Sequence, residues 1–403
     1  MAESDPADPR IPVTLLTGFL GAGKTTLLNR LVTHPDMAGT ALLINEFGAV
    51  GIDHHLVERI GETMVLLESG CVCCTVRGDL VEALAQLHGK LARREIPQIR
   101  RVLIETTGLA DPVPVVWTLM EERFVAARFR CDGVVTLVDT RLGADQLAQH
   151  EEARRQVALA DRILLTKPDL ADRSARERLA AALDALNPSA PRLAAAHGEV
   201  EPGRILGAGL YAAGSRPAEV ARWAAEVEAA ARDGAAEPSA HAAGAAATSF
   251  TRYFDRQVPW RGFAVAMGEI LAEYGSRLLR VKGLMGVAGL SGPVVVQCVE
   301  RVAYPPVRLA RWPSQGTRFD MRGRLVFIGR DLPEGAMDDI RRRLADLPGD
   351  AAALRAAARS PMLPTRCWLG ARMPVQGRAD METEGWHVQP LALGGARRAA
   401  GQP

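Results

Sequence analysis

Short apolar runs alternate with longer amphipathic stretches over roughly the first 200 residues of the chain. Such continuous runs are typical of strands that are buried on both faces of a sheet. Between them, Leu80, Leu84, Leu87 and Leu91 recur with helical spacing. The alternation predicts an α/β fold, with a mainly parallel sheet flanked by helices. The apolar runs are VTLLT (13–17), ALLIN (41–45), MVLL (64–67), VLIE (102–105), VVTLV (134–138) and ILLT (163–166).

The pattern changes after residue 207. Residues 208–247 are rich in alanine, glycine and polar residues, and they are predicted to form a linker with room for one helix around Trp223. Over residues 248–347, strand-like runs such as FTRYF and RLVFIGRDL mix with a predicted helix over GEILAEYGSRLLRVKG (268–283). This second pattern predicts a smaller C-terminal α+β domain. Residues 348–403 show no clear period and stay unassigned.

Composition and charge are those of an ordinary soluble globular protein. Hydrophobic residues make up 48% and charged residues 24% of the 403 residues, a length that predicts more than one domain. Lysine plus arginine number 49 against 47 aspartate plus glutamate, so the net charge is only +2. That balance gives no general attraction to nucleic acid or to an anionic membrane, and we expect neither as a partner.

The segment MAESDPADPR (1–10) is polar and acidic, and we expect it to be disordered ahead of a first domain over residues 11–207. It lacks the basic region and apolar stretch of a signal peptide. The sequence has no apolar run near the ~18 residues that a membrane span needs. We therefore expect a cytoplasmic protein whose six cysteines stay reduced.

The segment GFLGAGKT (18–25) fits the phosphate-binding pattern G-x-x-x-x-G-K-[ST] at every fixed position. A strand is predicted before it and a helix from Thr26 onward. The glycines let backbone N–H groups converge on phosphate oxygens, and the helix directs its positive end at the same anion. Lys24 is predicted to reach the β- and γ-phosphates, and Thr25 to offer its hydroxyl to Mg²⁺. The alternative is a plain glycine turn between a strand and a helix.

The run VLIETTGLADP (102–112) ends a predicted strand on a carboxylate. Glu105 stands at the strand end, where it can hold Mg²⁺ or its water. Gly108 follows in the loop, where its N–H can contact the γ-phosphate. The alternative is a buried strand followed by an ordinary loop. In a chain that also has a phosphate-binding loop, the functional interpretation is favoured.

The run ADRILLTKPDL (160–170) places Thr166, Lys167 and Asp169 at the end of another apolar strand. An aspartate there can accept both hydrogens from the N1 and N2 edge of guanine, whereas adenine would leave the carboxylate unsatisfied. The lysine stem can cover the base. Thr166 stands where G proteins more often have asparagine, so the other edge of the base is expected to be held less firmly. The loop predicts a preference for GTP and GDP.

The segment GCVCCT (70–75) packs Cys71, Cys73 and Cys74 into one turn. Thiolates at this spacing suit Zn²⁺ or another thiophilic ion. Glu46, in the loop after the second predicted strand, is a candidate fourth ligand, and water or a ligand from a client protein are the others. Metal binding would lower the pKa of the thiols and release protons. The alternatives are a redox pair and inert buried thiols.

The remaining cysteines and the histidines carry weaker signals. Cys131, Cys298 and Cys367 are isolated, and we interpret them as packing residues or incidental thiols. The eight histidines are scattered along the chain. His197 is interpreted as a surface or loop residue rather than a metal ligand.

As a set, these motifs resemble those of one family. The chain is similar to the CobW-type family of P-loop GTPases (SIMIBI class) in GFLGAGKTTLL, INEFG, GCVCCTVRGDL, IETTGLADP, ADRILLTKPD, LLRVKGLM and LVFIGRDL. Members are regarded as metallochaperones related to the urease and hydrogenase maturation GTPases. The resemblance covers roughly residues 11–347. It implies a GTPase domain, a smaller CobW-type domain, and slow GTP hydrolysis coupled to holding and delivering a metal, most commonly zinc.

The resemblance also implies ligand sets and shows two departures. The linker has only His241 where many members carry a histidine-rich stretch, so metal buffering by such a tract is not expected. Ala49 follows INEFG where many members have glutamate, so metal affinity or choice can differ. The implied ligands are Gly18, Gly21, Ala22, Gly23, Lys24, Thr25 and Thr26 for phosphate, Thr166, Lys167 and Asp169 for the base, and Cys71, Cys73 and Cys74 for metal.

The predicted function is a GTP-hydrolysing chaperone, monomeric or homodimeric, that binds Mg²⁺ through Thr25 and Glu105 and delivers Zn²⁺ to a client metalloprotein. The γ-phosphate would order the segments around Glu46 and Gly108, and hydrolysis would relax them. Glu46 and Glu105 are also the candidates for orienting the attacking water. Within the same class, the metal is alternatively Co²⁺ or Fe²⁺. Alternatives from other classes are a redox-sensing regulatory GTPase switch and a small-molecule kinase.

Overall fold

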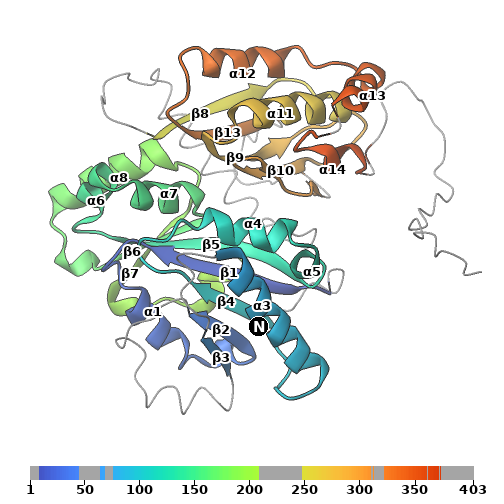
Figure 1. Cartoon of the computed structure of the whole chain (residues 1–403). Helices are drawn as coiled ribbons and strands as arrows, with labels where there is room; N and C mark the ends of the chain where they lie inside the picture. The colour runs from blue at the N-terminus through green and yellow to red at the C-terminus, as the bar shows by residue number, and fades with distance from the viewer. Residues whose placement is uncertain are drawn as a thin grey trace, which may run out of the picture.

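Two β-sheets organise the chain, one in each half of the sequence (Figure 1). The computed structural model describes residues 9–44, 64–68, 76–207, 247–309, 312, 322–360, 362–371 and 373. The first sheet is parallel and flanked by helices, and the second is antiparallel. The predicted fold class is therefore confirmed.

The N-terminal sheet has seven strands, and all of its pairs are parallel. In spatial order the strands are β3 (Met64–Glu68), β2 (Thr40–Ile44), β4 (Arg101–Glu105), β1 (Ile11–Gly18), β5 (Phe129–Asp139), β6 (Arg162–Thr166) and β7 (Arg192–Ala195). Each of the six predicted runs forms one of the first six strands. The sequence did not predict β7, because the apolar residues of this short edge strand are only Leu193 and two alanines.

Helices cover both faces of this sheet (Figure 1). Leu15 of β1 clusters with Leu84 and Val116 on one face, whereas Leu16 clusters with Leu27 and Leu31 on the other, because successive side chains of a strand alternate. The helices are α1 (Lys24–Leu31), α3 (Val76–Ala92), α4 (Val113–Glu121), α5 (Arg123–Ala126), α6 (Gly143–Gln149), α7 (Glu151–Leu159), α8 (Arg173–Leu186) and α9 (Pro202–Ile205), with short 3-10 turns η1 (Pro35–Met37), η2 (Pro168–Leu170) and η3 (Ala196–Gly198). The predicted leucine helix is α3.

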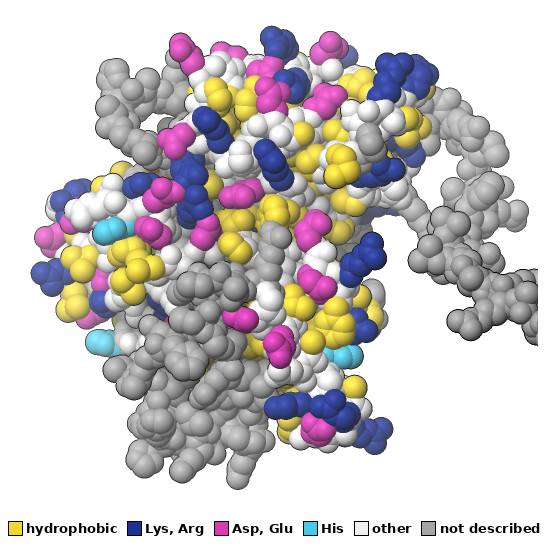
Figure 2. All heavy atoms as spheres, in the orientation of Figure 1, with side chains coloured by type: hydrophobic (Ala, Val, Ile, Leu, Met, Phe, Trp, Pro, Cys, Tyr) yellow, Lys and Arg dark blue, Asp and Glu magenta, His cyan; other side chains and the backbone are white. Residues whose placement is uncertain are grey.

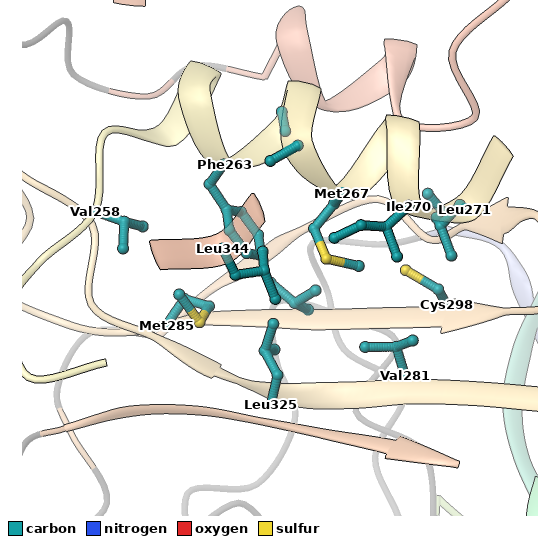
Figure 3. Packing of buried hydrophobic residues seen from close by; sticks show 14 of the residues in the cluster. Val258, Phe263, Met267, Ile270, Leu271, Val281, Met285, Cys298, Leu325 and Leu344 are labelled. Atoms are coloured by element: carbon teal, nitrogen blue, oxygen red, sulfur yellow. The ribbon is translucent and has the colours of Figure 1, made fainter. Parts of the chain in front are cut away.

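The C-terminal sheet packs under a long helix, α11 (Trp260–Tyr274). Figure 3 shows Phe263, Met267 and Ile270 of this helix directed toward the sheet, where Val281 and Leu325 belong to the same buried cluster. The sheet order is β11 (Val302–Ala303), β10 (Val294–Val299), β9 (Leu278–Met285), β13 (Gly323–Arg330) and β8 (Ala247–Phe254), with β12 (Val307–Arg308) paired to β10.

One predicted element is wrong in extent and partly in type. The helix expected over residues 268–283 begins earlier, at Trp260, and ends at Tyr274. The following segment, LLRVKGLM, forms strand β9. Arg280 and Lys282 of this strand are buried. Burying a charge is unfavourable unless the charge is paired, so these two side chains need partners of opposite charge.

Residues beyond 347 add two helices to the C-terminal half. After α12 (Ala336–Ala345), helices α13 (Asp350–Arg359) and α14 (Arg366–Leu369) pack beside α11. Trp368 is fully buried, and its carbonyl oxygen accepts a hydrogen bond of 2.8 Å from the indole N–H of Trp260. Two tryptophans thus join the segment that showed no period to the core of the second half.

The two halves of the molecule share a hydrophobic interface. Leu147 of α6 and Val157 of α7 belong to one buried cluster with Leu284, Val295 and Ile328 of the C-terminal sheet. In addition, α7 contacts β9, and α8 contacts β8. The C-terminal sheet therefore has α11 on one face and helices of the N-terminal half on the other.

The visible surface mixes the two signs of charge. On the face drawn in Figure 2, Lys and Arg side chains are interspersed with Asp and Glu over the described part of the C-terminal half. Neither sign of charge dominates the described C-terminal part of that face. Among the described residues, no helix combines the length and apolar character that crossing a membrane requires.

Candidate nucleotide-binding site

The loop between β1 and α1 has a backbone that requires glycine. Gly23 caps the start of α1 with φ 91°, and Gly18 has φ 147°, both in a region that other residues rarely adopt. At Gly18 space is also lacking, because a Cβ there would lie 2.6 Å from the carbonyl oxygen of Leu137. The backbone of the loop itself therefore requires glycine at positions 18 and 23.

Lys24 and Thr25 begin helix α1 at the mouth of this loop. The Nζ atom of Lys24 donates to the carbonyl oxygen of Gly18 at 2.7 Å, so the ammonium lies across the loop. Thr25 is half-buried, and Thr26 is exposed. Gly23 supplies no side-chain cap, so the first backbone N–H groups of α1 lie free of a capping side chain, as anion binding requires.

Glu105 lies at the end of β4, directly beside the end of β1. It pairs in register with Leu16, and its side chain is buried. Thr106 continues along β1: its N–H donates to the Leu16 carbonyl at 3.0 Å, and its hydroxyl to Thr17 Oγ1 at 2.8 Å. The carboxylate is thereby held at the same sheet edge as the phosphate-binding loop.

Gly108 lies against the phosphate-binding loop itself. A Cβ at this position would be 2.7 Å from the backbone nitrogen of Leu20 and 2.8 Å from its Cα. Any side chain would therefore separate the two loops. From the other side, the Nε2 atom of Gln156 donates to the carbonyl oxygens of Gly108 and Ala110, each at 3.1 Å.

The segment TKPD is also joined to the phosphate-binding loop. The hydroxyl of Thr166 donates to the Ala22 carbonyl at 2.8 Å, and Lys167 Nζ donates to the Gly21 carbonyl at 2.7 Å. Lys167 Nζ also pairs with Asp139 Oδ2 at 2.7 Å. Sequence reasoning missed Asp139, although its place at the end of the apolar run before β6 was a usable signal. Thr166 thus binds the loop backbone, as an anchor between β6 and α1.

Asp169, which was predicted to bind guanine, faces His197. Asp169 is in η2, with 41% of its side chain exposed, and its Oδ2 is 4.0 Å from Nε2 of His197. His197 is in η3, which packs on the start of α1: a Cβ on Gly198 would be 3.0 Å from the Thr26 carbonyl oxygen. His197 is exposed, as expected, and it lies beside Asp169 of the predicted base site. Its position directly after β7 was the sequence signal for this neighbourhood.

The predicted zinc ligands Cys71, Cys73, Cys74 and Glu46 lie outside the described residues, as do Ala49 and His241. The strands that precede them are described. Ile44, the last residue of β2, pairs with Glu68 at the end of β3 and with Glu105 at the end of β4. The two segments therefore leave the sheet from adjacent strands, at the edge that carries Glu105.

One cluster among the described residues brings metal-binding atom types together. Ligand atoms of His34, Asp36 and Glu201 all lie within 4.8 Å of one another. However, His34 Nδ1 accepts a 3.2 Å hydrogen bond from the Asp36 N–H, so in the neutral ring Nε2 carries the proton. That Nε2 faces Glu201 at 3.7 Å. The geometry suits a surface hydrogen bond or ion pair rather than a metal.

The cysteines that the structure describes fit their interpretation as packing residues or incidental thiols. Cys131 and Cys298 are buried, and Cys367 is exposed. Burial raises the pKa of the Cys131 thiol to about 12 and also raises that of Cys298 well above its usual range. Both thiols are therefore protonated at neutral pH, a form that neither binds metal nor attacks a disulfide.

The fold and the site together define a P-loop GTPase. A parallel sheet presents a phosphate-binding loop, a buried carboxylate on the neighbouring strand and a T-K-x-D loop at one edge. The chain belongs to the CobW/HypB/UreG family: the nucleotide-binding domain of that family matches residues 12–194. The C-terminal domain of the cobalamin synthesis protein cobW matches residues 247–347.

Relatives with names and structures extend the similarity over most of the chain. The zinc chaperone YjiA of Escherichia coli (strain K12) is 32% identical over 340 residues, which cover 84% of this chain and 98% of YjiA. The zinc chaperone CobW of a Sinorhizobium species is 32% identical over 230 residues, 50% of this chain and 63% of CobW. The crystal structure of Zn(II)-bound YjiA GTPase from E. coli superposes with a TM-score of 0.60 at 28% identity, covering 84% of this chain and 99% of that one.

Proposed function

We propose that this GTPase is a zinc chaperone that holds Zn²⁺ with Cys71, Cys73, Cys74 and Glu46 and delivers it to a client metalloprotein. Two relatives are named zinc chaperones, and one of them has been solved with Zn(II) bound. Three clustered thiols and one carboxylate are the number and kind of ligands that a tetrahedral zinc site requires. Zinc is the cargo of this reaction, so the site must also release it.

The register of the N-terminal sheet supports this proposal most directly. Ile44 pairs with Glu68 and with Glu105, and Leu16 pairs with Glu105. Adjacent strands lie about 4.8 Å apart, so the four strand ends form one short row. The segments that carry the glutamate and the thiols begin in this row, next to the phosphate-binding loop. A metal held there would lie close to the nucleotide.

The residues at the phosphate side fit Mg-GTP. Thr25 offers a hydroxyl and Glu105 a carboxylate, the hard oxygen donors that Mg²⁺ prefers. When bound, Mg²⁺ would be held by Thr25 and Glu105 and would neutralise negative charge on the β- and γ-phosphate oxygens. Lys24 would turn its ammonium from the Gly18 carbonyl toward the same oxygens. Gly108 would donate its backbone N–H to the γ-phosphate, and Asp169 would accept from the guanine edge.

The proposal couples zinc affinity to the bound nucleotide. The γ-phosphate would hold the loop at Gly108 and the segment after β2, and hydrolysis would release both. Coupling is reciprocal, so zinc must change GTP affinity by the same factor as GTP changes zinc affinity. Titration of a non-hydrolysable GTP analogue with and without Zn²⁺ measures this factor. Identical affinities would remove the coupling from the proposal.

Metal analysis of a Cys73→Ala/Cys74→Ala variant tests the zinc ligands. A variant of YjiA in which one glutamate and two cysteines were replaced by alanine was also solved with Zn(II) bound. Bound zinc alone therefore does not identify the thiol site, and the stoichiometry must be compared. We expect the double variant to bind one Zn²⁺ fewer than the wild type. Cys367→Ala, which removes an exposed isolated thiol, should retain the full amount, and equal content in all three proteins would contradict the proposed ligands.

Competition among metals tests the choice of cargo. Soft thiolate ligands favour Zn²⁺ over Fe²⁺ and Co²⁺, following the general order of affinity. We expect Zn²⁺ to displace Co²⁺ from the site, seen as loss of the visible cobalt–thiolate absorption. Failure of Zn²⁺ to displace Co²⁺ would indicate a cobalt chaperone of the same family.

A further inference from the structure

Helix α7 and the residue before it contact two loops of the nucleotide site. His150, which precedes the helix, stacks on Phe19 of the phosphate-binding loop with ring centroids 4.5 Å apart. Gln156, which is fully buried, donates to the carbonyl oxygens of Gly108 and Ala110. Arg155 forms an ion pair with Asp111 in the same loop. The loop that carries Gly108 is therefore fastened to α7.

Both ends of α7 are also fastened to the C-terminal sheet. Arg330, the last residue of β13, pairs with Glu151 in the first turn of the helix. Arg280 of β9 donates to the carbonyl oxygen of Leu159, the last residue of the helix. The helix lies between the two sheets in Figure 1.

The ion pairs of α7 form a chain in which two groups are shared. Glu151 Oε1 accepts from Arg155 Nε at 3.0 Å and also pairs with Arg330. Arg155 divides its guanidinium between Glu151 and Asp111. Burial and the charge of Asp111 raise the pKa of Glu300, which lies in the turn between β10 and β11. Arg155 therefore stands between an acid on its own helix and an acid of the Gly108 loop.

We propose that the C-terminal domain sets the preference of the nucleotide site for GTP over GDP through Arg330, Glu151 and Arg155. The inference rests on the proposed contact between Gly108 and the γ-phosphate. With Arg330 on Glu151, Arg155 is available to Asp111, and the Gly108 loop is held in place. Without Arg330, Glu151 attracts Arg155 more strongly and Asp111 is released. GDP has no γ-phosphate, so its affinity does not depend on this loop.

The direct test replaces Arg330 in the full-length protein. We expect Arg330→Ala to weaken binding of a non-hydrolysable GTP analogue by about fivefold or more while GDP affinity stays within about twofold, both measured by calorimetry. KM for GTP should rise correspondingly. Arg330→Lys keeps a cation for Glu151 and should restore most of the preference. Arg341→Ala is the matched control, because Arg341 pairs with Asp338 within α12, at 3.2 Å, and does not reach α7.

A double-mutant cycle separates this relay from general destabilisation. In a Glu151→Gln background the competitor for Arg155 is absent, so adding Arg330→Ala should leave the ratio of GTP to GDP affinity unchanged. Glu151→Gln alone should keep at least the wild-type preference for GTP over GDP. If Arg330→Ala does not fold, the ratio of GTP to GDP affinity in Glu151→Gln tests the proposal instead. Equal losses of GTP and GDP affinity in Arg330→Ala, or additive effects in the cycle, would overturn the inference.

Gly108→Ala distinguishes failure of this inference from failure of the proposed function. If Gly108→Ala lowers GTP affinity selectively and Arg330→Ala does not, the relay is wrong and the γ-phosphate contact stands. If Gly108→Ala leaves the ratio of the two affinities unchanged, the proposed γ-phosphate contact is wrong, and the inference fails with it.

Discussion

The two sheets of this molecule place their polar residues in opposite ways. In the N-terminal sheet, Glu105 and Thr166 lie at strand ends, at the edge that carries the phosphate-binding loop. In the C-terminal sheet, Arg280 and Lys282 lie within a strand and face the other half of the molecule. Parallel strands bring all their carboxyl ends to one edge, where loops build a site. Antiparallel strands end at both edges, so this sheet uses its face instead.

The N-terminal sheet places polar residues at the nucleotide site, whereas the C-terminal sheet uses buried polar residues to contact the other half of the molecule. Asp161, at the start of β6, accepts from the Val134 N–H at 3.0 Å and pairs with both Arg280 and Lys282. All three side chains are buried. The carboxylate of Asp161 neutralises part of the positive charge of Arg280 and Lys282, and each of these buried groups would be unfavourable without its partner. The interface is therefore specific as well as hydrophobic.

Replacing Asp161 should produce the largest effect and break the contact between the two halves. Asp161→Ala leaves two buried cations without their shared carboxylate, so we expect the free energy of unfolding to fall by about 3–5 kcal/mol. Urea denaturation measures this change. Asp338→Ala, which removes an exposed ion pair on α12, is the control and should cost less than about 1 kcal/mol. Similar losses in the two variants would show that the buried cluster adds nothing special.

Replacing Lys24 should strongly slow GTP hydrolysis and leave the fold intact. Lys24→Ala deletes the ammonium that lies across the phosphate-binding loop, so we expect kcat for GTP hydrolysis to fall about 100-fold or more. Single-turnover assays of phosphate release measure this loss, and circular dichroism tests whether the fold is retained. Lys90→Ala on α3 should hydrolyse GTP at the wild-type rate. Retained activity in Lys24→Ala would remove this residue from the site.

Replacing Asp169 should change the choice of base. Asp169→Asn substitutes a donor for one carboxylate oxygen, so we expect the preference for GTP over ATP to fall by about 10- to 100-fold. Competition between labelled nucleotides measures the ratio. Asp172→Asn is a suitable control, because Asp172 caps α8 by accepting from the Ala175 N–H at 2.7 Å. A preserved preference in Asp169→Asn would place guanine recognition elsewhere, with His197 as the next residue to replace.

The smallest expected effect concerns pH and the turn that carries Glu300. Burial and the charge of Asp111 raise the pKa of Glu300, whereas Arg155 and Arg301 oppose the shift. A raised carboxyl pKa means that the folded state binds the proton more tightly. The stability associated with the protonated group is therefore present below the unfolded pKa of about 4.3 and is lost as pH rises through the raised value.

The comparison with Glu300→Gln isolates this contribution. We expect the wild type to lose stability relative to the variant as pH rises from about 4 through the raised pKa, and the difference to level off above it. Urea unfolding of both proteins across this range measures the difference. A gap that is independent of pH would contradict the role of burial and Asp111 at this position.

Parts of the site were predictable because they are local. Gly18, Lys24 and Thr25 occur in one short segment whose backbone conformation and chemistry are set by neighbouring residues. Glu105 and the T-K-x-D loop were predictable because apolar strands of a parallel sheet end at a common edge. Asp139 was missed, and the position of His197 beside Asp169 was not foreseen, because both depend on how separate loops meet.

The sequence by itself determined six of the seven strands of the first sheet, the phosphate-binding loop and the membership in a GTPase family, because buried runs and glycine loops are encoded over a few consecutive residues. Only the tertiary structure decided that LLRVKGLM is a strand, since Asp161, far away in the chain, is what makes Arg280 and Lys282 acceptable inside it. The same holds for α7. Its residues contact the Gly108 loop and the C-terminal sheet at once, and a linear pattern contains no information about two partners that only folding brings together.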